Sequence, residues 1–224
     1  MQGDGYERVT HSGMGTGLGA GLEIRRLEFP PRALPDVEDL DLPLSQGSVV
    51  LQSSIMRKIV LGLGISLDGY IARPNGAVDF LFMPKDYSMA SFLATIDTYV
   101  MGRKTLDVAL KMSGKPYTSP GGLATYVFSH SQPPGERDGL TFVNESPTAF
   151  VGRLRKSPGK DIWHMGGGEL AREFLKADLI DELYLGVVPV LIGEGIPLFP
   201  SGFPQRNFSL IENNLFQRDD RAEV

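Results

Sequence analysis

One stretch of this chain limits the possible folds more than any other. The run from Asp161 to Met165 is short and mainly apolar, and three glycines follow it. Apolar residues then recur at helical spacing, at Leu170, Phe174 and Leu175. We therefore predict a buried strand that turns into a helix at residues 166–168. Such a turn presents backbone N–H groups at the positive end of a helix, where a phosphate can bind. A tight turn without a ligand explains the stretch equally well, because glycine-rich turns are common.

Strands and helices alternate along the chain from Met56 onward. The first predicted strand, residues 58–66, is apolar nearly throughout, which is typical of a strand covered on both faces. Strands that alternate with helices indicate an α/β fold, in which helices cover both faces of a mostly parallel twisted sheet. The further predicted strands are 98–101, 124–128, 141–143, 161–165, 182–192 with a break near Pro189, and 208–212; the predicted helices are 88–96, 103–111, 146–155 and 169–177.

The first 55 residues differ in composition from the rest. Residues 1–21 contain seven glycines, and residues 29–45 are rich in proline and acidic residues. The glycines at 13–19 resemble a dinucleotide fingerprint, but Ala20 breaks the pattern and no predicted strand precedes them. We predict that residues 1–55 are a low-complexity or poorly ordered extension and that residues 56–224 form the folded domain. A natural start of the chain near Met56 is the alternative.

Composition excludes several classes of site. The chain has no cysteine, which excludes disulfides, cysteine nucleophiles and thiolate metal sites. Its three histidines, His11, His130 and His164, are scattered, so we expect no histidine-based metal site. No apolar run approaches the roughly 20 residues that span a bilayer. The net charge of −5 and the lack of a basic stripe argue against binding to nucleic acid. We predict a cytoplasmic protein.

Three predicted strands end in residues that suit phosphate groups. One is followed by Gly102, Arg103, Lys104 and Thr105, another by Ser129 and His130, and a third by the three glycines at 166–168. Ligands of open parallel sheets gather at the carboxyl ends of the strands. Each of these strand ends, considered alone, is more simply interpreted as a solvated turn. Together they favour a nucleotide with separated phosphates, such as NADPH.

Two carboxylates follow the first predicted strand. Asp68 and Asp79 lie in the loop after it, where either could meet a substrate, although an exposed carboxylate without a role is the ordinary alternative. Residues 64–68 come close to a nucleophile elbow, but Asp68 stands in place of the final glycine. His164 lies inside a predicted strand, and we expect it to be packed or hydrogen-bonded rather than catalytic.

Four blocks of the sequence carry a resemblance to a known family. The chain resembles the dihydrofolate-reductase-like family typified by the C-terminal reductase domain of bacterial riboflavin biosynthesis, and within it the small stand-alone members. The resemblance covers residues 56–212 and implies a three-layer fold, an NADPH cofactor, and hydride transfer to a pterin-like, pyrimidine-like or carbonyl substrate in a homodimer. The blocks are Ile65–Ala72, Val100–Thr105, His164–Gly168 and Pro189–Phe199.

The same resemblance implies roles for individual residues. Ser129 would lie at the adenosine 2′-phosphate, where many relatives have an arginine in the next position and this chain has His130. Ile65 would flank the nicotinamide. Asp68 and Asp79 are the catalytic candidates, and Ser66, Asp68 and Phe80 the substrate-binding ones. The remaining cofactor-binding candidates are Gly102, Arg103, Lys104 and Thr105 for phosphates and Gly166, Gly167, Gly168 and Glu169 for the pyrophosphate.

The chain departs from the family at two places. The predicted helix at 88–96 contains no acid, and only Asp86 lies near its start, so we do not expect authentic folate reduction. Residues 217–224 are polar, which indicates that the final strand of the family is missing and that a sheet edge is left for a second copy or for the N-terminal extension. A non-catalytic nucleotide-binding or assembly protein, or a damaged or mis-started gene product, remain alternatives.

Overall fold

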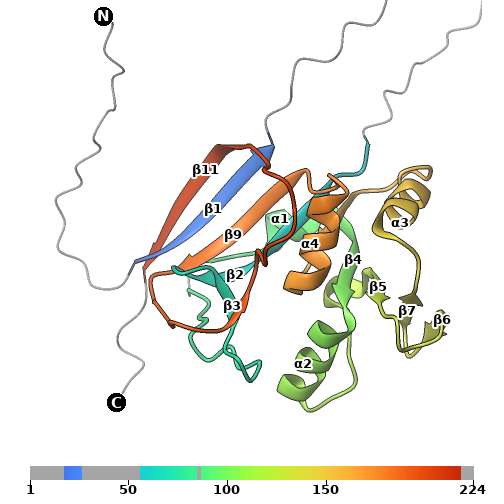
Figure 1. Ribbon diagram of the computed structural model, residues 1–224, viewed down its shortest axis with the longest axis horizontal. Coiled ribbons are helices and arrows are strands. Elements are labelled where there is room, and N and C mark those ends of the chain that lie inside the picture. The colour runs from blue at the N-terminus through green and yellow to red at the C-terminus, as the bar shows by residue number, and fades with distance from the viewer. Residues whose placement is uncertain (1–17, 27–55, 85–86, 218–224) are drawn as a thin grey trace, which may run out of the picture.

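The computed structural model describes residues 18–26, 56–84 and 87–217 (Figure 1). The strands are β1 (Leu18–Arg26), β2 (Ile59–Ser66), β3 (Tyr70–Ala72), β4 (Ile96–Gly102), β5 (Ala124–Phe128), β6 (Gly135–Arg137), β7 (Leu140–Val143), β8 (Asp161–His164), β9 (Glu182–Val188), β10 (Ile196–Pro197) and β11 (Phe208–Gln217). The helices are α1 (Ala90–Thr95), α2 (Arg103–Ser113), α3 (Pro147–Leu154) and α4 (Gly168–Lys176), with a 3₁₀ turn η2 at Pro120–Gly122.

Local sequence explains where several helices begin and end. Ser146 precedes α3, and its side chain accepts a hydrogen bond from the Ala149 backbone N–H, while Pro147 occupies the first helical position. α2 ends at Gly114, whose φ of 60° lies in the left-handed region that glycine adopts at helix ends.

A nine-stranded sheet in the order β11-β1-β9-β2-β8-β4-β5-β7-β6 forms the middle layer of the fold. Its centre, from β9 to β7, is parallel. One face packs against α3 and α4 through Phe150, Phe174 and Leu175. The other face packs against α1 and α2, where Phe92 and Leu106 meet Tyr99 and Trp163. The predicted three-layer, mostly parallel α/β fold is confirmed.

Strand order creates a crevice in the middle of the sheet. β8 lies between β2 and β4, so β4 and β8 are neighbours although they are far apart in sequence. The helix after β4 covers one face of the sheet, and the helix after β8 covers the other. Parallel sheets bind ligands at such a switch point, outside the carboxyl ends of the strands.

The N-terminal strand β1 lies inside the sheet. It pairs antiparallel with β9 from Ala20 to Arg25 and with β11 along its whole length. Residues 18–26 therefore belong to the sheet, whereas the sequence places them in a poorly ordered extension. They lie between β9 and β11, whereas the sequence predicts only that the extension could cover a sheet edge left by a missing final strand. The rest of the predicted extension, together with Asp86 and residues 218–224, lies outside the described residues.

Several predicted boundaries are wrong. Ile96 begins β4 rather than ending the preceding helix. The predicted strand does not resume at 190–192 after Pro189, and β11 extends five residues past its predicted end, to Gln217. The short strand β6, which forms a hairpin with β7, and the small sheet of β3 with β10 were not predicted.

Candidate active site

Two of the three predicted phosphate-binding strand ends meet at the switch point. The Met165 backbone N–H donates to the Val100 carbonyl at 2.9 Å, which joins the end of β8 to β4. A Cβ atom on Gly167 would lie 3.0 Å from Thr105 Oγ1 and 3.9 Å from the Gly102 nitrogen. The glycine turn after β8 therefore lies directly against the start of α2. The close approach explains why position 167, with a φ of 92°, is a glycine.

The helices that start at this crevice lack the usual side-chain cap. The N-cap residues of α2 and α4 are Gly102 and Gly167, and neither helix has a side-chain capping hydrogen bond among the described residues. α3, which starts elsewhere, is capped by Ser146. The first N–H groups of α2 and α4 thus have no side-chain acceptor where the two helices come together. An anion at this position would accept them.

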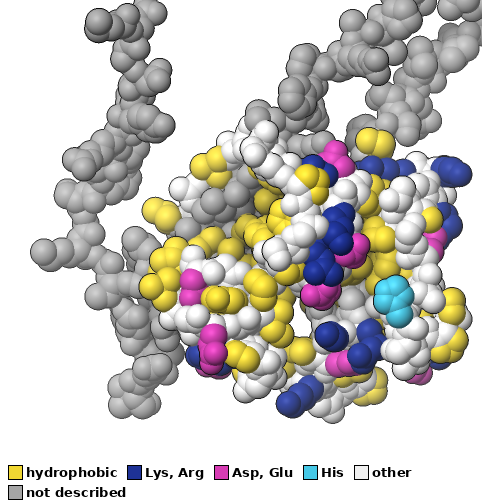
Figure 2. Space-filling model, in the orientation of Figure 1, with side chains coloured by type: hydrophobic (Ala, Val, Ile, Leu, Met, Phe, Trp, Pro, Cys, Tyr) yellow, Lys and Arg dark blue, Asp and Glu magenta, His cyan; other side chains and the backbone are white. Residues whose placement is uncertain are grey.

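Charges around the crevice are mixed. α2 has no acid in its first turn, and it begins with Arg103, which pairs with Asp107, and the exposed Lys104. The exposed Glu169 lies in the first turn of α4 and pairs with Arg172 at 2.5 Å. Figure 2 shows Lys and Arg side chains over α4 and α2, on either side of a hollow in the surface. Cations at the start of α2 oppose the helix dipole unless an anion joins them.

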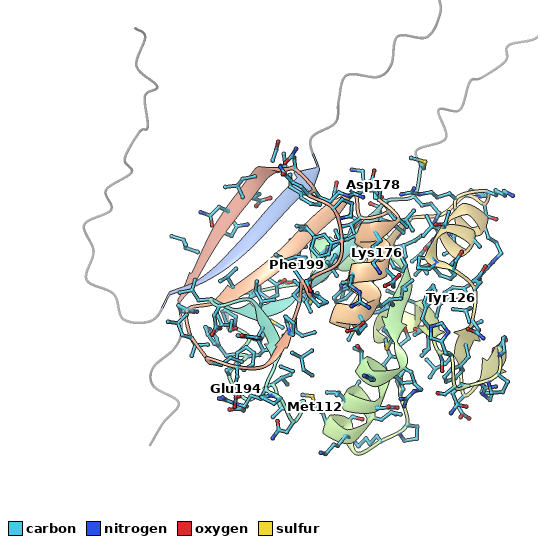
Figure 3. All side chains as sticks on the ribbon, viewed as in Figure 1. Met112, Tyr126, Lys176, Asp178, Glu194 and Phe199 are labelled. Carbon is cyan, nitrogen blue, oxygen red and sulfur yellow. The ribbon has the colours of Figure 1, made fainter. Side chains whose placement is uncertain are left out.

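The segment after β10 closes one side of the turn. A Cβ atom on Gly168 would overlap the carbonyl oxygen of Pro197 and lie 3.3 Å from the Pro200 ring. Figure 3 shows Phe199 on this segment as it passes α4. Gly168 is therefore a glycine because the backbone of 197–200 packs against the first turn of α4.

The end of β5 provides the third predicted phosphate position. Ser129 is buried, and its Oγ accepts hydrogen bonds from the backbone N–H groups of Ser131 and Gln132 at 3.3 and 3.0 Å. His130 is exposed, and its Nδ1 lies 2.9 Å from Asn144 Oδ1. The Ser129 hydroxyl thus shapes the turn, while the His130 ring is held at the surface.

The buried side chain of His164 holds the glycine turn by a hydrogen bond. Its Nδ1 accepts a hydrogen bond from the Gly166 backbone N–H at 3.1 Å, and its ring packs edge-on against Phe174. The side chain is fully buried, and this burial lowers its pKa to about 4. His164 is therefore neutral at pH 7, in agreement with the predicted packed role.

Comparison with known proteins identifies the family. The family model of the RibD C-terminal domain matches residues 57–219. The chain belongs to this family. It is 40% identical over 147 residues to the uncharacterised Bacillus subtilis (strain 168) protein YwjB, a match that covers 64% of this chain and 83% of YwjB.

Two solved structures are similar to the chain. One is a putative riboflavin biosynthesis protein from Shewanella sp. PV-4, with 30% identity, a TM-score of 0.57, and coverage of 73% of this chain and 99% of that one. The other is a diaminohydroxyphosphoribosylaminopyrimidine deaminase/5-amino-6-(5-phosphoribosylamino)uracil reductase from Thermotoga maritima, with 13% identity, a TM-score of 0.51, and coverage of 74% and 58%. The second similarity is one of fold.

In this RibD C-terminal domain the first catalytic candidate, Asp68, joins two loops. Its Oδ1 accepts from the Ser66 hydroxyl at 2.6 Å, and its Oδ2 accepts from the backbone N–H groups of Ile192 and Gly193 at 3.1 and 2.8 Å. These hydrogen bonds, the Ser66 one above all, lower the pKa of Asp68. The carboxylate is therefore ionised at neutral pH and fastens the loop after β2 to residues 192–193.

The other predicted substrate-side residues lie in the same region. Asp79 forms a bidentate ion pair with Arg73 at 2.7 and 2.9 Å, which lowers the pKa of Asp79. Ser66 is fully buried, and its Oγ accepts from the Tyr70 N–H at 3.0 Å. Ile65 is buried at the end of β2, and Phe80 is half-buried. The catalytic and substrate-binding roles of these residues stay predictions.

Two glycines lie opposite each other in the neighbouring strands β2 and β9, and the sequence did not predict this pairing. Gly64 in β2 lies in register with Gly186 in β9. Glycine is unfavourable inside a strand and often marks a place where a ligand or another backbone comes close. The available signal was glycine inside an apolar strand, at Gly62 and Gly64 in β2 and at Gly186 in β9.

The described part of the chain was searched for metal sites and for membrane-spanning helices. It contains no group of three or more His, Asp or Glu residues placed to hold a metal ion. None of its helices is long and apolar enough to cross a membrane.

Burial of His164 predicts a loss of stability in acid. Its pKa is about 4 in the folded chain and near 6.5 when unfolded, so below about pH 6.5 the unfolded state binds more protons. The stability that the folded chain gains from holding His164 neutral is fully present above pH 6.5 and is lost as the pH falls toward 4. We expect the free energy of unfolding to fall by about 2 kcal/mol between pH 7 and pH 5 from this group alone. Urea unfolding of the wild type and of His164→Gln at both pH values measures it; an equal fall in both proteins would contradict it.

Proposed function

We propose that this protein is an NADPH-dependent reductase that transfers a hydride to a small heterocyclic substrate of the pterin or pyrimidine type, or to a carbonyl compound. One observation carries the proposal: the starts of α2 and α4, both capped by glycine, meet at the switch point of a parallel sheet. Two phosphates can bind there to backbone N–H groups and to the cations of α2. A cytoplasmic homodimer is the expected setting.

Family membership supports a reductase of a pyrimidine-like substrate. The similar Thermotoga maritima protein is named as a reductase of 5-amino-6-(5-phosphoribosylamino)uracil, and the similar Shewanella protein as a putative riboflavin biosynthesis protein. Extension of either activity to this chain is part of the proposal. The acid-free helix α1 argues against a true dihydrofolate reductase.

The protein residues would bind and orient the cofactor, which supplies the hydride when bound. The N–H groups of 103–105 and 168–170 would hold its phosphates, with Lys104 and Arg103 offsetting the negative charge. Thr105 lies at the contact between α2 and the glycine turn and would bind the same phosphates. Ser129 and His130 would flank the adenosine end. Ile65 at the end of β2 would line the nicotinamide side.

An arginine in place of His130 should strengthen the preference for NADPH over NADH. Arginine is always charged and would donate hydrogen bonds to the 2′-phosphate that NADPH carries and NADH lacks. We expect His130→Arg to raise the ratio of NADPH to NADH affinity about tenfold at pH 8, because a charge-assisted hydrogen bond contributes on the order of 1.5–3 kcal/mol. Titration with both nucleotides measures this, and an unchanged ratio would place the 2′-phosphate elsewhere.

Activity is tested by NADPH oxidation. The full chain is incubated with NADPH and, in turn, dihydropterins, ribosylaminopyrimidines, quinones and small aldehydes, and absorbance at 340 nm is followed. Substrate-dependent oxidation supports the proposal. A chain that binds NADPH and oxidises it with none of these compounds would reject the reductase activity for these substrate classes.

A second candidate function is a nucleotide-binding or assembly protein without turnover. One observation favours it: both predicted catalytic carboxylates are already bound by protein groups, Asp68 by Ser66 and residues 192–193 and Asp79 by Arg73. This alternative predicts nucleotide binding that no substrate affects. It also predicts that Asp68→Asn changes stability and leaves nucleotide affinity unchanged.

A further inference from the structure

The side chain of His164 is a buried titratable group that the proposed reaction does not use. His164 ends β8, in register with Leu61 of β2 and Val100 of β4, and it is fully inaccessible to solvent. Its ring lies edge-on to Phe174, a core residue of α4, with the ring centroids 4.8 Å apart. An apolar side chain of similar size would fill this position without burying a polar ring. Packing alone therefore does not explain an imidazole here.

The two ring nitrogens of His164 differ in what they contact. Nδ1 accepts the hydrogen bond of the Gly166 backbone N–H, so the neutral ring carries its proton on Nε2. Nε2 is buried and has no hydrogen-bond partner of normal geometry among the described residues. The Leu170 carbonyl favours the protonated ring, but burial outweighs it and keeps the pKa low. The polar contribution of the ring is therefore concentrated at Nδ1, which faces the glycine turn.

The bond from Gly166 to His164 gives the glycine turn a fixed direction. Gly166 and Gly167 have φ values of 103° and 92°, and glycine has more freedom than any other residue to leave such a conformation. A Cβ on Gly166 would lie 2.9 Å from Leu63 Cδ1, a contact that limits bulk and does not orient the N–H group. The hydrogen bond to Nδ1 does orient it. His164 thus sets the peptide plane that leads into α4.

The peptide held by His164 lies immediately before the N–H groups proposed to bind phosphate. Gly167 is the N-cap of α4, and its carbonyl accepts the Ala171 N–H at 2.9 Å. The N–H groups of residues 168–170 come next, and the first N–H groups of a helix have no partner within it. A rotation at Gly166 would therefore change the direction of these free N–H groups.

We propose that His164 is a positioning residue for the cofactor: its unprotonated Nδ1 holds Gly166, so that the N–H groups of residues 168–170 face the phosphates before the nucleotide binds. The inference rests on the proposed function and adds the residue that preorganises its binding site. A site that is already held in the bound geometry loses less conformational freedom when the ligand arrives, which raises affinity. His164 itself does not touch the nucleotide.

Two substitutions separate the hydrogen-bond acceptor from the packing. His164→Asn keeps an acceptor near the place of Nδ1, because both atoms are bonded to Cγ. His164→Leu has no acceptor but fills the core with apolar atoms, so it should be the more stable of the two in urea unfolding. Calorimetric titration of the full chain with NADP⁺ should give the opposite order. We expect affinity within about threefold of the wild type in His164→Asn and lower by about tenfold or more in His164→Leu.

Leu175→Val is the control, since it changes a buried residue of α4 away from the turn and should leave NADP⁺ affinity within about twofold of the wild type. Circular dichroism first confirms that each variant is folded. Affinities that follow stability, or a folded His164→Leu that binds NADP⁺ like the wild type, would overturn the role of His164 alone. Failure of NADP⁺ to bind the wild type would instead reject the proposed function.

Hydrogen exchange of the Gly166 amide in the wild type is a second measurement, and it needs no variant. A hydrogen-bonded, buried amide exchanges slowly, so we expect NMR at pH 7 to show exchange at least about tenfold slower than in the unfolded chain. Exchange at the unfolded rate would overturn the hydrogen bond on which the inference depends, whether or not the protein binds a nucleotide.

Discussion

Deletion of residues 1–27 is expected to lower the melting temperature by about 10 °C or more, or to leave the chain insoluble. β1 is the strand that joins β11 to the sheet, because β9 and β11 each pair with β1 and not with each other. Its loss removes two ladders of backbone hydrogen bonds, each bond contributing about 0.5–1.5 kcal/mol. Small domains have only about 5–15 kcal/mol of stability in total. Thermal unfolding followed by circular dichroism measures the change.

Two controls distinguish the loss of β1 from the effect of shortening the chain. Deletion of residues 1–16 keeps β1 and should leave the melting temperature within about 2 °C of the wild type. A synthetic peptide of residues 16–28, added to the chain that lacks residues 1–27, should restore part of the lost stability by strand addition. A deleted chain as stable as the wild type would show that β1 contributes nothing to the sheet.

Gly168→Ala is expected to weaken NADPH binding by tenfold or more and to destabilise the fold by about 1–3 kcal/mol. Alanine is normally favoured over glycine in a helix by about 1 kcal/mol. At position 168, however, the added methyl group would overlap the Pro197 carbonyl, so the 197–200 segment or the first turn of α4 must move. A movement of that turn displaces the N–H groups proposed to bind the pyrophosphate.

Gly152→Ala is the matched control for this substitution. Gly152 lies in α3 with open space around its Cβ position, so the same change should be neutral or slightly stabilising and should leave NADPH affinity unchanged. Calorimetric titration and urea unfolding of both variants provide the comparison. Normal NADPH affinity in a folded Gly168→Ala protein would show that this turn does not bind the cofactor.

The parts of the fold that the sequence predicts are those with strong local signals. β8 and α4 follow from an apolar run, a glycine turn and a helical stripe, and α3 follows from Ser146 and Pro147. Such signals depend on neighbours within a few residues. They identify elements well and boundaries less well: Ile96 fits the apolar stripe of α1, but its pairing with β8 places it in β4.

β1 could not be predicted in the same way. Its sequence is rich in glycine, which is unfavourable in strands, and its neighbours in the sheet lie more than 150 residues away. The strand forms because β9 and β11 leave a position between them that residues 18–26 fill. Tertiary pairing thus overrides the local preference.

The sequence also predicts some parts of the candidate site and not others. The glycine turn, α2 and Ser129 lie at strand ends, so parallel topology alone brings them to one edge of the sheet. The contacts of Asp68 with Ile192 and Gly193 join positions about 125 residues apart, and no local pattern reveals them. The sequence therefore predicts a carboxylate near the substrate, whereas the structure shows that it fastens two loops.

Calorimetric titration of the full chain with NADPH shows whether the crevice between β4 and β8 binds this nucleotide. We expect saturable binding of one nucleotide per chain, weakened tenfold or more by Gly168→Ala and unaffected by Gly152→Ala. Absence of binding to the wild type, or binding that Gly168→Ala leaves unchanged, would contradict it.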